Sequence, residues 1–197
     1  MKKIMFNDKY GLTQAVLDGR KTQTRRIACQ EPFKRYQRSG FCTEGKDKCK
    51  LFINDGNEIV AKSHYKIGEI VAVAQRYKDI ATAPLINKLK YIDHPGWGNK
   101  MFVKAEMMPH KIKITNIRVE HLHNISKEDC IKEGIFCSHH EGFKDAFAFD
   151  ATDRSEVEKW WLPSPIIAFS ILIDILYGIS TWMQNPLVFV YDFELVK

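Results

Sequence analysis

The segment Leu187–Val196, close to the C-terminus, has the most regular pattern in this sequence and constrains the fold more than any other. Every second residue is apolar or aromatic, so that one face would carry Leu187, Phe189, Tyr191, Phe193 and Leu195. A repeat of two residues is the period of a β-strand. Asn185-Pro186, just before the segment, is a turn signal. We therefore expect a long strand here, and with it a fold that contains a sheet.

Two further segments indicate strands of the same sheet. Residues 68–74 (GEIVAVA) form a short apolar run bounded by turn signals, which is typical of a buried strand. Residues 111–120 (KIKITNIRVE) alternate, but the phase slips by one residue after Ile114. A β-bulge near Thr115–Asn116 would explain that slip. We expect these two strands and Leu187–Val196 to lie in one curved sheet.

Helices are expected on either side of these strands. Apolar spacing predicts one helix over 11–18, closed by Gly19, and another over Pro165–Tyr177, stopped by Gly178. Residues 20–26 are predicted to form a turn that runs into an extended segment. Because the helices do not alternate with the strands as βαβ units, an α+β fold around a mixed or barrel-like sheet fits better than a doubly wound parallel sheet.

A third helix is predicted by its capping residues. Ser126 and Asp129 approximate a capping box, and the helix that they open would end near Glu133, with Gly134 just beyond it. A carboxylate at a helix C-terminus faces the negative end of the helix dipole, which costs roughly 0.3–1 kcal/mol. Either Glu133 has a functional use that accounts for its position, or it is solvated and the cost is trivial.

The length of 197 residues suits one domain with long insertions, expected at about 28–64, 78–100 and 136–162, where periodicity is poor. The longest apolar run, 166–177, has 12 residues and contains Asp174, which makes it too short to span a membrane. The N-terminus lacks the apolar stretch of a secretory signal. The five cysteines are an odd number and indicate free thiols. Together these features predict a cytoplasmic protein with no membrane partner.

Positive charge is concentrated at the start of the chain. Residues 1–50 contain 13 Lys and Arg against 5 Asp and Glu, whereas residues 51–197 contain 17 against 19. A one-sided basic region suits a polyanionic partner such as RNA, DNA or a nucleotide. The alternative is a solvated, lysine-rich surface.

The segment 16–26 (VLDGRKTQTRR) resembles the signature of the ASCH superfamily, in particular its phage- and prophage-encoded branch. Four further segments resemble that family in the same order, at 65–73, 113–120, 125–135 and 182–194. The resemblance implies a PUA-like fold, which is a small mixed β-barrel with flanking helices. It also implies binding of RNA or modified nucleosides and, for some members, hydrolysis of the amide of N4-acetylcytidine.

The resemblance assigns roles to individual residues. It implies that Lys21, Thr24 and Glu133 are catalytic and that Arg26 binds the substrate. This chain departs from the phage branch at Ala74-Gln75-Arg76, where that branch has an Arg-Glu pair, so a carboxylate that many relatives place near the cleft is missing.

General chemistry is consistent with these roles. A threonine hydroxyl such as that of Thr24 becomes nucleophilic when a base takes its proton. Lys21 can be that base if desolvation or nearby cations lower its pKa. The candidate cations, which are also candidate substrate ligands, are Arg20, Arg25 and Arg26. Lys21 and Thr24 are three residues apart and meet only if the segment bends. The alternative is a basic patch that contacts phosphates without catalysis.

Two loops supply further binding candidates. Aromatic and basic side chains are interleaved in one of them, a pattern that suits base stacking with phosphate contacts; its candidates are Lys34, Arg35, Tyr36 and Arg38. Trp97, between two glycines, is a candidate lid over a base. The alternative is that the aromatic side chains of both loops pack against the core and fix the loops to it. We expect no metal site, because neither Cys42 and Cys49 nor Cys137, His139 and His140 have a zinc-site spacing.

Three hypotheses follow for the function. The first is an RNA- or nucleoside-binding module with its cleft at 19–26 and Glu133. The second is a hydrolase that acts on a modified nucleoside or on RNA from the same cleft. The third is a phage-derived structural or partner-binding protein without catalysis. None of them requires a cofactor.

Overall fold

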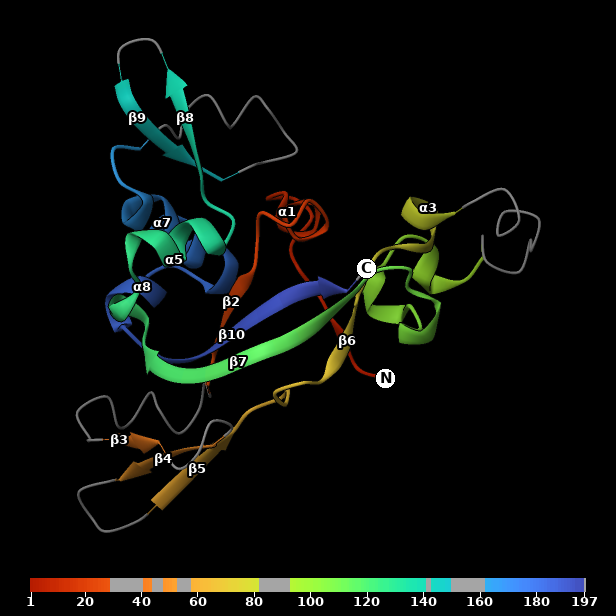
Figure 1. Ribbon diagram of the computed structural model, residues 1–197, viewed down its shortest axis with the longest axis horizontal. Helices are drawn as coiled ribbons and strands as arrows, with labels where there is room; N and C mark the ends of the chain where they lie inside the picture. The colour runs from red at the N-terminus through yellow and green to blue at the C-terminus, as the bar shows by residue number, and fades with distance from the viewer. Residues whose placement is uncertain are drawn as a thin grey trace.

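The computed structural model describes residues 1–28, 41–43, 48–52, 58–81, 93–140, 143–149 and 162–196. Its centre is a five-stranded mixed sheet in the order β1-β6-β7-β10-β2 (Figure 1). The strands are β1 (Lys3–Ile4), β2 (Gln23–Ile27), β6 (Ile70–Val73), β7 (Lys111–His121) and β10 (Leu187–Val196). Only the β1–β6 pair is parallel. The α+β class is confirmed, but the described strands do not close into a barrel, so the PUA-like barrel stays a prediction.

The three strands expected in one sheet are neighbours in it, since β7 pairs with both β6 and β10. The phase slip in β7 is a bulge. Asp192 of β10 lies opposite Asn116, while the next residue, Phe193, lies opposite Ile114. Thr115 is therefore the extra residue, as the sequence predicted.

The helices expected from the sequence are present. They are α1 (Leu12–Leu17), α5 (Lys127–Lys132) and α7 (Pro165–Tyr177), to which the short α8 (Thr181–Gln184) is added. The Ser126 hydroxyl accepts from the backbone N–H of Asp129 at 3.1 Å, which confirms the N-cap of α5. Figure 1 shows α5, α7 and α8 gathered on one side of β2, β10 and β7.

Strand β10 is buried more completely than its alternation indicates. Val188 and Val190, on the face expected to be exposed, are 1% and 0% exposed, which is as buried as Tyr191 on the opposite face. Both faces are covered, because Tyr65 packs against Tyr191 from one side while α7 joins the same core from the other. Half-exposure begins only at Asp192.

Two of the expected insertions contain sheets of their own. The first contains an antiparallel meander of β3 (Phe41–Thr43), β4 (Lys48–Phe52) and β5 (Glu58–Lys62). Poor periodicity predicted no strands in the insertion at 136–162, and this is wrong for the hairpin of β8 (Phe136–His140) and β9 (Phe143–Ala148). Its strands are defined by their mutual pairing, with a register shift, and not by a local period.

A second, smaller hydrophobic core contains described residues between β6 and β7. It packs around Tyr77, Val103 and Met108. The elements here are α3 (Tyr77–Ile80) and the 3₁₀ turns η2 (Pro95–Trp97), η3 (Lys100–Phe102) and η4 (Ala105–Met107), and η5 (Leu122–Asn124) follows β7. None of the helices in the described ranges is long and apolar enough to cross a membrane.

A substitution at Gly134, which follows α5, tests the backbone conformation at that residue. Its φ is +105°, and a Cβ there would lie 3.2 Å from Leu12 Cδ2. We expect Gly134→Ala to lower the free energy of unfolding in urea by about 1–3 kcal/mol, because alanine strains this conformation. The control is Gly98→Ala, at φ −103° with open space around it, which should change stability by less than about 0.5 kcal/mol. Equal stability of the two variants would contradict the conformation of Gly134.

Candidate functional site

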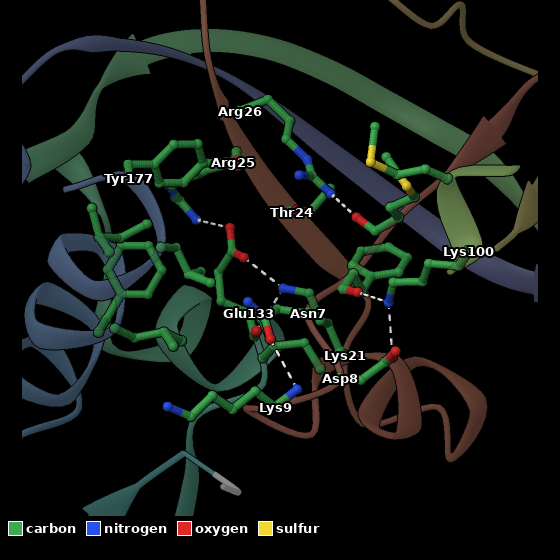
Figure 2. A pocket seen from close by; sticks show the side chains of 18 of the residues that line it. Asn7, Asp8, Lys9, Lys21, Thr24, Arg25, Arg26, Lys100, Glu133 and Tyr177 are labelled. Carbon is green, nitrogen blue, oxygen red and sulfur yellow. Dashed lines mark hydrogen bonds and ion pairs between the residues drawn. The ribbon is translucent and has the colours of Figure 1, made fainter. Parts of the chain in front are cut away.

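A cavity of about 540 Å³ lies beside strand β2 (Figure 2). Its walls come from the segment after β1, from β2, from the end of α5, from α7 and from η3. The lining residues with polar or aromatic groups include Phe6, Asp8, Lys21, Thr24, Arg25, Arg26, Lys100, Glu133 and Tyr177. Five residues that the sequence singled out, Lys21, Thr24, Arg25, Arg26 and Glu133, are thus brought together from segments more than 100 positions apart.

The cavity can reach both faces of β2 because this strand is at the edge of the sheet. Thr24 lies opposite Tyr191 and Arg25 opposite Val190, so their side chains point to opposite faces. Both line the same cavity. β10 is the only neighbour of β2 among the described strands, and the other edge is open to the cavity. Tyr177 of α7 meets this edge, where its hydroxyl donates to the Arg25 carbonyl at 3.2 Å.

Lys21 lies on the bend that the catalytic hypothesis requires. The chain turns at Gly19, whose φ is +74°, and the Lys21 N–H donates back to the Ala15 carbonyl at 2.8 Å. The strand begins only at Gln23. The Lys21 ammonium is 2% exposed and donates to the Glu133 carboxylate at 2.7 Å and to the Glu133 carbonyl at 2.5 Å. Lys21 and Glu133 therefore form a buried ion pair.

The pKa of Lys21 lies below its ordinary value of 10.5, and burial is the main cause. The Glu133 charge and hydrogen bond act in the opposite direction, and Arg26 and Arg25 lower the pKa by smaller amounts. The sequence named both causes of a lowered pKa, desolvation and the neighbouring arginines, but could not rank them, because the depth of burial of a side chain depends on tertiary packing.

Arg25 is committed to carboxylates and is not free for a ligand. Its guanidinium donates to Gln23 at 2.5 Å, Glu133 at 3.1 Å, Glu120 at 2.7 Å and Asp129 at 3.0 Å. Its side chain is 1% exposed. This geometry favours a role in holding Glu133 and the end of α5 over the predicted role in substrate binding.

The sequence reasoning missed the rest of this ion-pair network. Arg118 donates to Glu120, Asp129 and Asp192 at 3.1, 2.6 and 2.9 Å. Arg118 lies opposite Val190 in the same register as Arg25, so the two guanidiniums share one face of the sheet. The alternation of Arg118 and Glu120 in the predicted strand was the available signal, since charged residues on a covered face require partners.

Thr24 and Arg26 keep polar groups available in the cavity. Thr24 is 4% exposed, and its hydroxyl makes no hydrogen bond within the described ranges. Arg26 is half-buried, with its guanidinium 5.7 Å from the ring centroid of Phe6. It donates to the Met5 carbonyl at 2.7 Å but has no carboxylate partner in the described part of the chain. Among the arginines of the motif, Arg26 is the one placed to receive a ligand.

Lys100 and Asp8 form a second polar centre that the sequence did not indicate. The Lys100 ammonium lies 2.8 Å from Asp8 Oδ1 and 3.3 Å from the Thr13 hydroxyl, and it also bonds the Phe6 carbonyl. The two residues are 92 positions apart, and no local pattern links them.

The remaining predicted site residues lie elsewhere. Arg20 is exposed, pairs with Asp18 at 3.2 Å and does not line this cavity. Trp97 packs against the smaller core and does not line it either. Lys34, Arg35, Tyr36 and Arg38 lie outside the described residues. Gln75, in place of the family's carboxylate, bonds His110 at 2.7 Å.

The cysteine and histidine candidates for a metal site receive no support. Within the described side chains, no three of His, Cys, Asp and Glu are grouped so as to hold a metal ion. The side chains of Cys42, Cys49, His139 and His140 lie outside that part of the structure.

No protein-family model, no curated protein and no solved structure matches this chain. The ASCH resemblance therefore rests on the sequence motifs alone.

The buried ion pair of Glu133 leads to a prediction of stability. Glu133→Gln leaves two buried cations facing a neutral amide, and we expect a loss of about 3–5 kcal/mol in the free energy of unfolding. The matched control is Glu194→Gln, whose carboxylate pairs with Lys113 at 3.7 Å on the surface and should matter by less than about 1 kcal/mol. Urea titrations measure both, and similar losses in the two variants would refute the buried pair.

Proposed function

We propose that the cavity binds a nucleoside, either free or as an unpaired residue of RNA. One observation carries the proposal: a cavity of about 540 Å³ is lined by the free Thr24 hydroxyl and by Arg26, which lacks a carboxylate partner in the described residues. Small-molecule sites are generally about 300–1,000 Å³, mostly apolar, with a few polar groups that fix orientation. An RNA helix does not fit such a space, whereas one unstacked base does.

Charge and motif support the same proposal. The excess of 13 Lys and Arg over 5 Asp and Glu in residues 1–50 suits a ligand that carries or adjoins phosphate. Four residues of the segment that resembles the ASCH signature line the cavity: Lys21, Thr24, Arg25 and Arg26. The apolar wall, which includes Leu172 and Ile173 of α7, suits the face of a base.

Arg26→Ala tests the site directly. We expect it to weaken nucleoside binding by about 10- to 100-fold, because it removes a charged hydrogen-bond donor from the cavity. Calorimetric titration with a panel of ribonucleosides, including N4-acetylcytidine, measures the effect. Arg20→Ala is the control, since Arg20 is exposed and outside the cavity, and it should bind as the wild type does. Absence of binding by the wild-type protein to the whole panel would refute the proposal.

A second candidate, hydrolysis of an acylated cytidine, is favoured by the contact between Lys21 and Glu133. Neutral Lys21 would accept the proton of the Thr24 hydroxyl, whose oxygen attacks the amide carbonyl carbon. The C–N bond then breaks, and the cytosine amine leaves with a proton that Lys21 or Glu133 supplies. Water finally cleaves the acyl ester and regenerates Thr24.

Thr24→Val separates binding from catalysis, because it removes the hydroxyl and keeps the shape. If the site is catalytic, Thr24→Val abolishes the release of cytidine from N4-acetylcytidine, measured by mass spectrometry, and Thr24→Ser retains part of it. Since neutral Lys21 is the active form, kcat/KM should rise with pH and level off above a pKa lower than 10.5. If the wild-type protein releases no cytidine, the catalytic candidate is refuted and nucleoside binding remains the proposed function.

A further inference from the structure

The cavity has a second polar end, which the proposed function does not use. In Figure 2, Glu133 and Tyr177 lie on one side of the cavity, and Asp8 and Lys100 on the other. Phe6 links the two ends, because its ring centroid is 5.8 Å from Lys21 Nζ while its carbonyl accepts from Lys100. A ligand that fills the cavity therefore meets both polar ends.

The end at Asp8 carries little net charge. Lys100 Nζ lies 2.8 Å from Asp8 Oδ1, so each charge is neutralised by the other. Burial acts to raise the pKa of Asp8, but the hydrogen bonds from Lys100 and Thr13 hold it below its ordinary value. Asp8 is thus a carboxylate at neutral pH. A phosphate placed here would face that carboxylate, which disfavours a phosphate ligand.

Two polar groups at this end are unused within the described residues. Asp8 Oδ1 accepts from Thr13 and Lys100, which leaves Oδ2 without a donor. The Asn99 side-chain oxygen accepts from the backbone N–H of Met101 at 2.9 Å, which leaves its amide NH₂ without an acceptor. Asp8 and Asn99, which both line the cavity, therefore offer one acceptor and one donor group.

A pair of neighbouring hydroxyls matches this set. A hydroxyl donates one hydrogen bond and accepts others, so one hydroxyl can donate to the Asp8 carboxylate while its neighbour accepts from the Asn99 amide. A phosphate offers no such donor. Nucleosides carry a pair of this kind on the 2′ and 3′ carbons of ribose, and deoxynucleosides lack it.

We infer that Asp8 and Asn99 bind the 2′- and 3′-hydroxyls of a ribose, so that the ligand is a ribonucleoside with a free sugar edge. This inference rests on the proposed function, since it presumes a nucleoside in the cavity. It excludes deoxyribonucleosides as good ligands. It also disfavours an internal residue of an RNA chain, whose 3′ oxygen is esterified and whose phosphate would face Asp8.

The test compares sugars on one base. Calorimetric titration of the wild-type protein with cytidine, uridine, adenosine, guanosine and N4-acetylcytidine identifies the base that binds best. The 2′-deoxy and 3′-deoxy forms of that nucleoside should each bind about 10-fold or more weakly, because a hydrogen bond with a charged or amide partner is lost.

Two isosteric variants locate the effect. Asp8→Asn keeps an oxygen for Lys100 and Thr13 but replaces the free acceptor by a donor. Asn99→Asp keeps the oxygen that accepts from Met101 and replaces the free donor by an acceptor. Each should weaken the ribonucleoside about 10-fold while changing the deoxy forms little. Asp79→Asn is the matched control, because Asp79 pairs with Arg76 outside the cavity.

The outcomes separate this inference from the function on which it rests. No binding of any nucleoside refutes both. Equal binding of ribo and deoxy forms by the wild-type protein refutes the ribose site and leaves nucleoside binding standing. Preference for ribose that persists in Asp8→Asn and Asn99→Asp also refutes it. If one variant does not fold, as judged by circular dichroism, the other variant and the wild-type comparison still decide.

Discussion

The two ion pairs of the Glu133 carboxylate are the interaction on which the rest of the site depends. One oxygen contacts Lys21 at 2.7 Å and the other contacts Arg25 at 3.1 Å, and all three side chains are buried. The carboxylate thereby connects the end of α5, the bend before β2 and the strand itself. A buried charge without a partner is costly, so this set must form together or not at all. It also offsets the unfavourable position of Glu133 at a helix C-terminus, because two cations face it.

The cations in and around the cavity differ in their partners within the described residues. Arg25 and Arg118 are paired with carboxylates and hold the helix layer to the sheet. Arg26 has a backbone carbonyl and an aromatic ring as its neighbours and keeps its charge available. Lys100 is balanced by Asp8. The cavity thus has one end suited to anionic or carbonyl groups and one end suited to hydroxyls. These two ends restrict the range of possible ligands more than the volume of the cavity does.

The edge position of β2 explains how a strand can build such a site. In a central strand, the side chains of Thr24 and Arg25 would point to opposite faces of the sheet and could not line one cavity. At an edge, the cavity wraps around the strand, so one side contacts the buried ion pairs and the other the N-terminal segment with Phe6. The Tyr177 hydroxyl donates to the Arg25 carbonyl at this edge. Without that bond, the carbonyl would be available for strand pairing with another chain.

The sequence alone determined the elements whose signals are local. The alternation of Leu187–Val196, the slip at Thr115 and the Ser126 cap each depend on neighbouring residues, and all three are confirmed. The sequence also selected Lys21 and Glu133, through a motif and a helix end. Tertiary structure alone decided how these residues are used. Burial, and not the arginines, is the main cause of the lowered Lys21 pKa, and Arg25 is paired where a ligand contact was expected. Asp8 and Lys100, 92 positions apart, share no local period, because side-chain pairing and desolvation depend on which segments meet in space and not on their order along the chain.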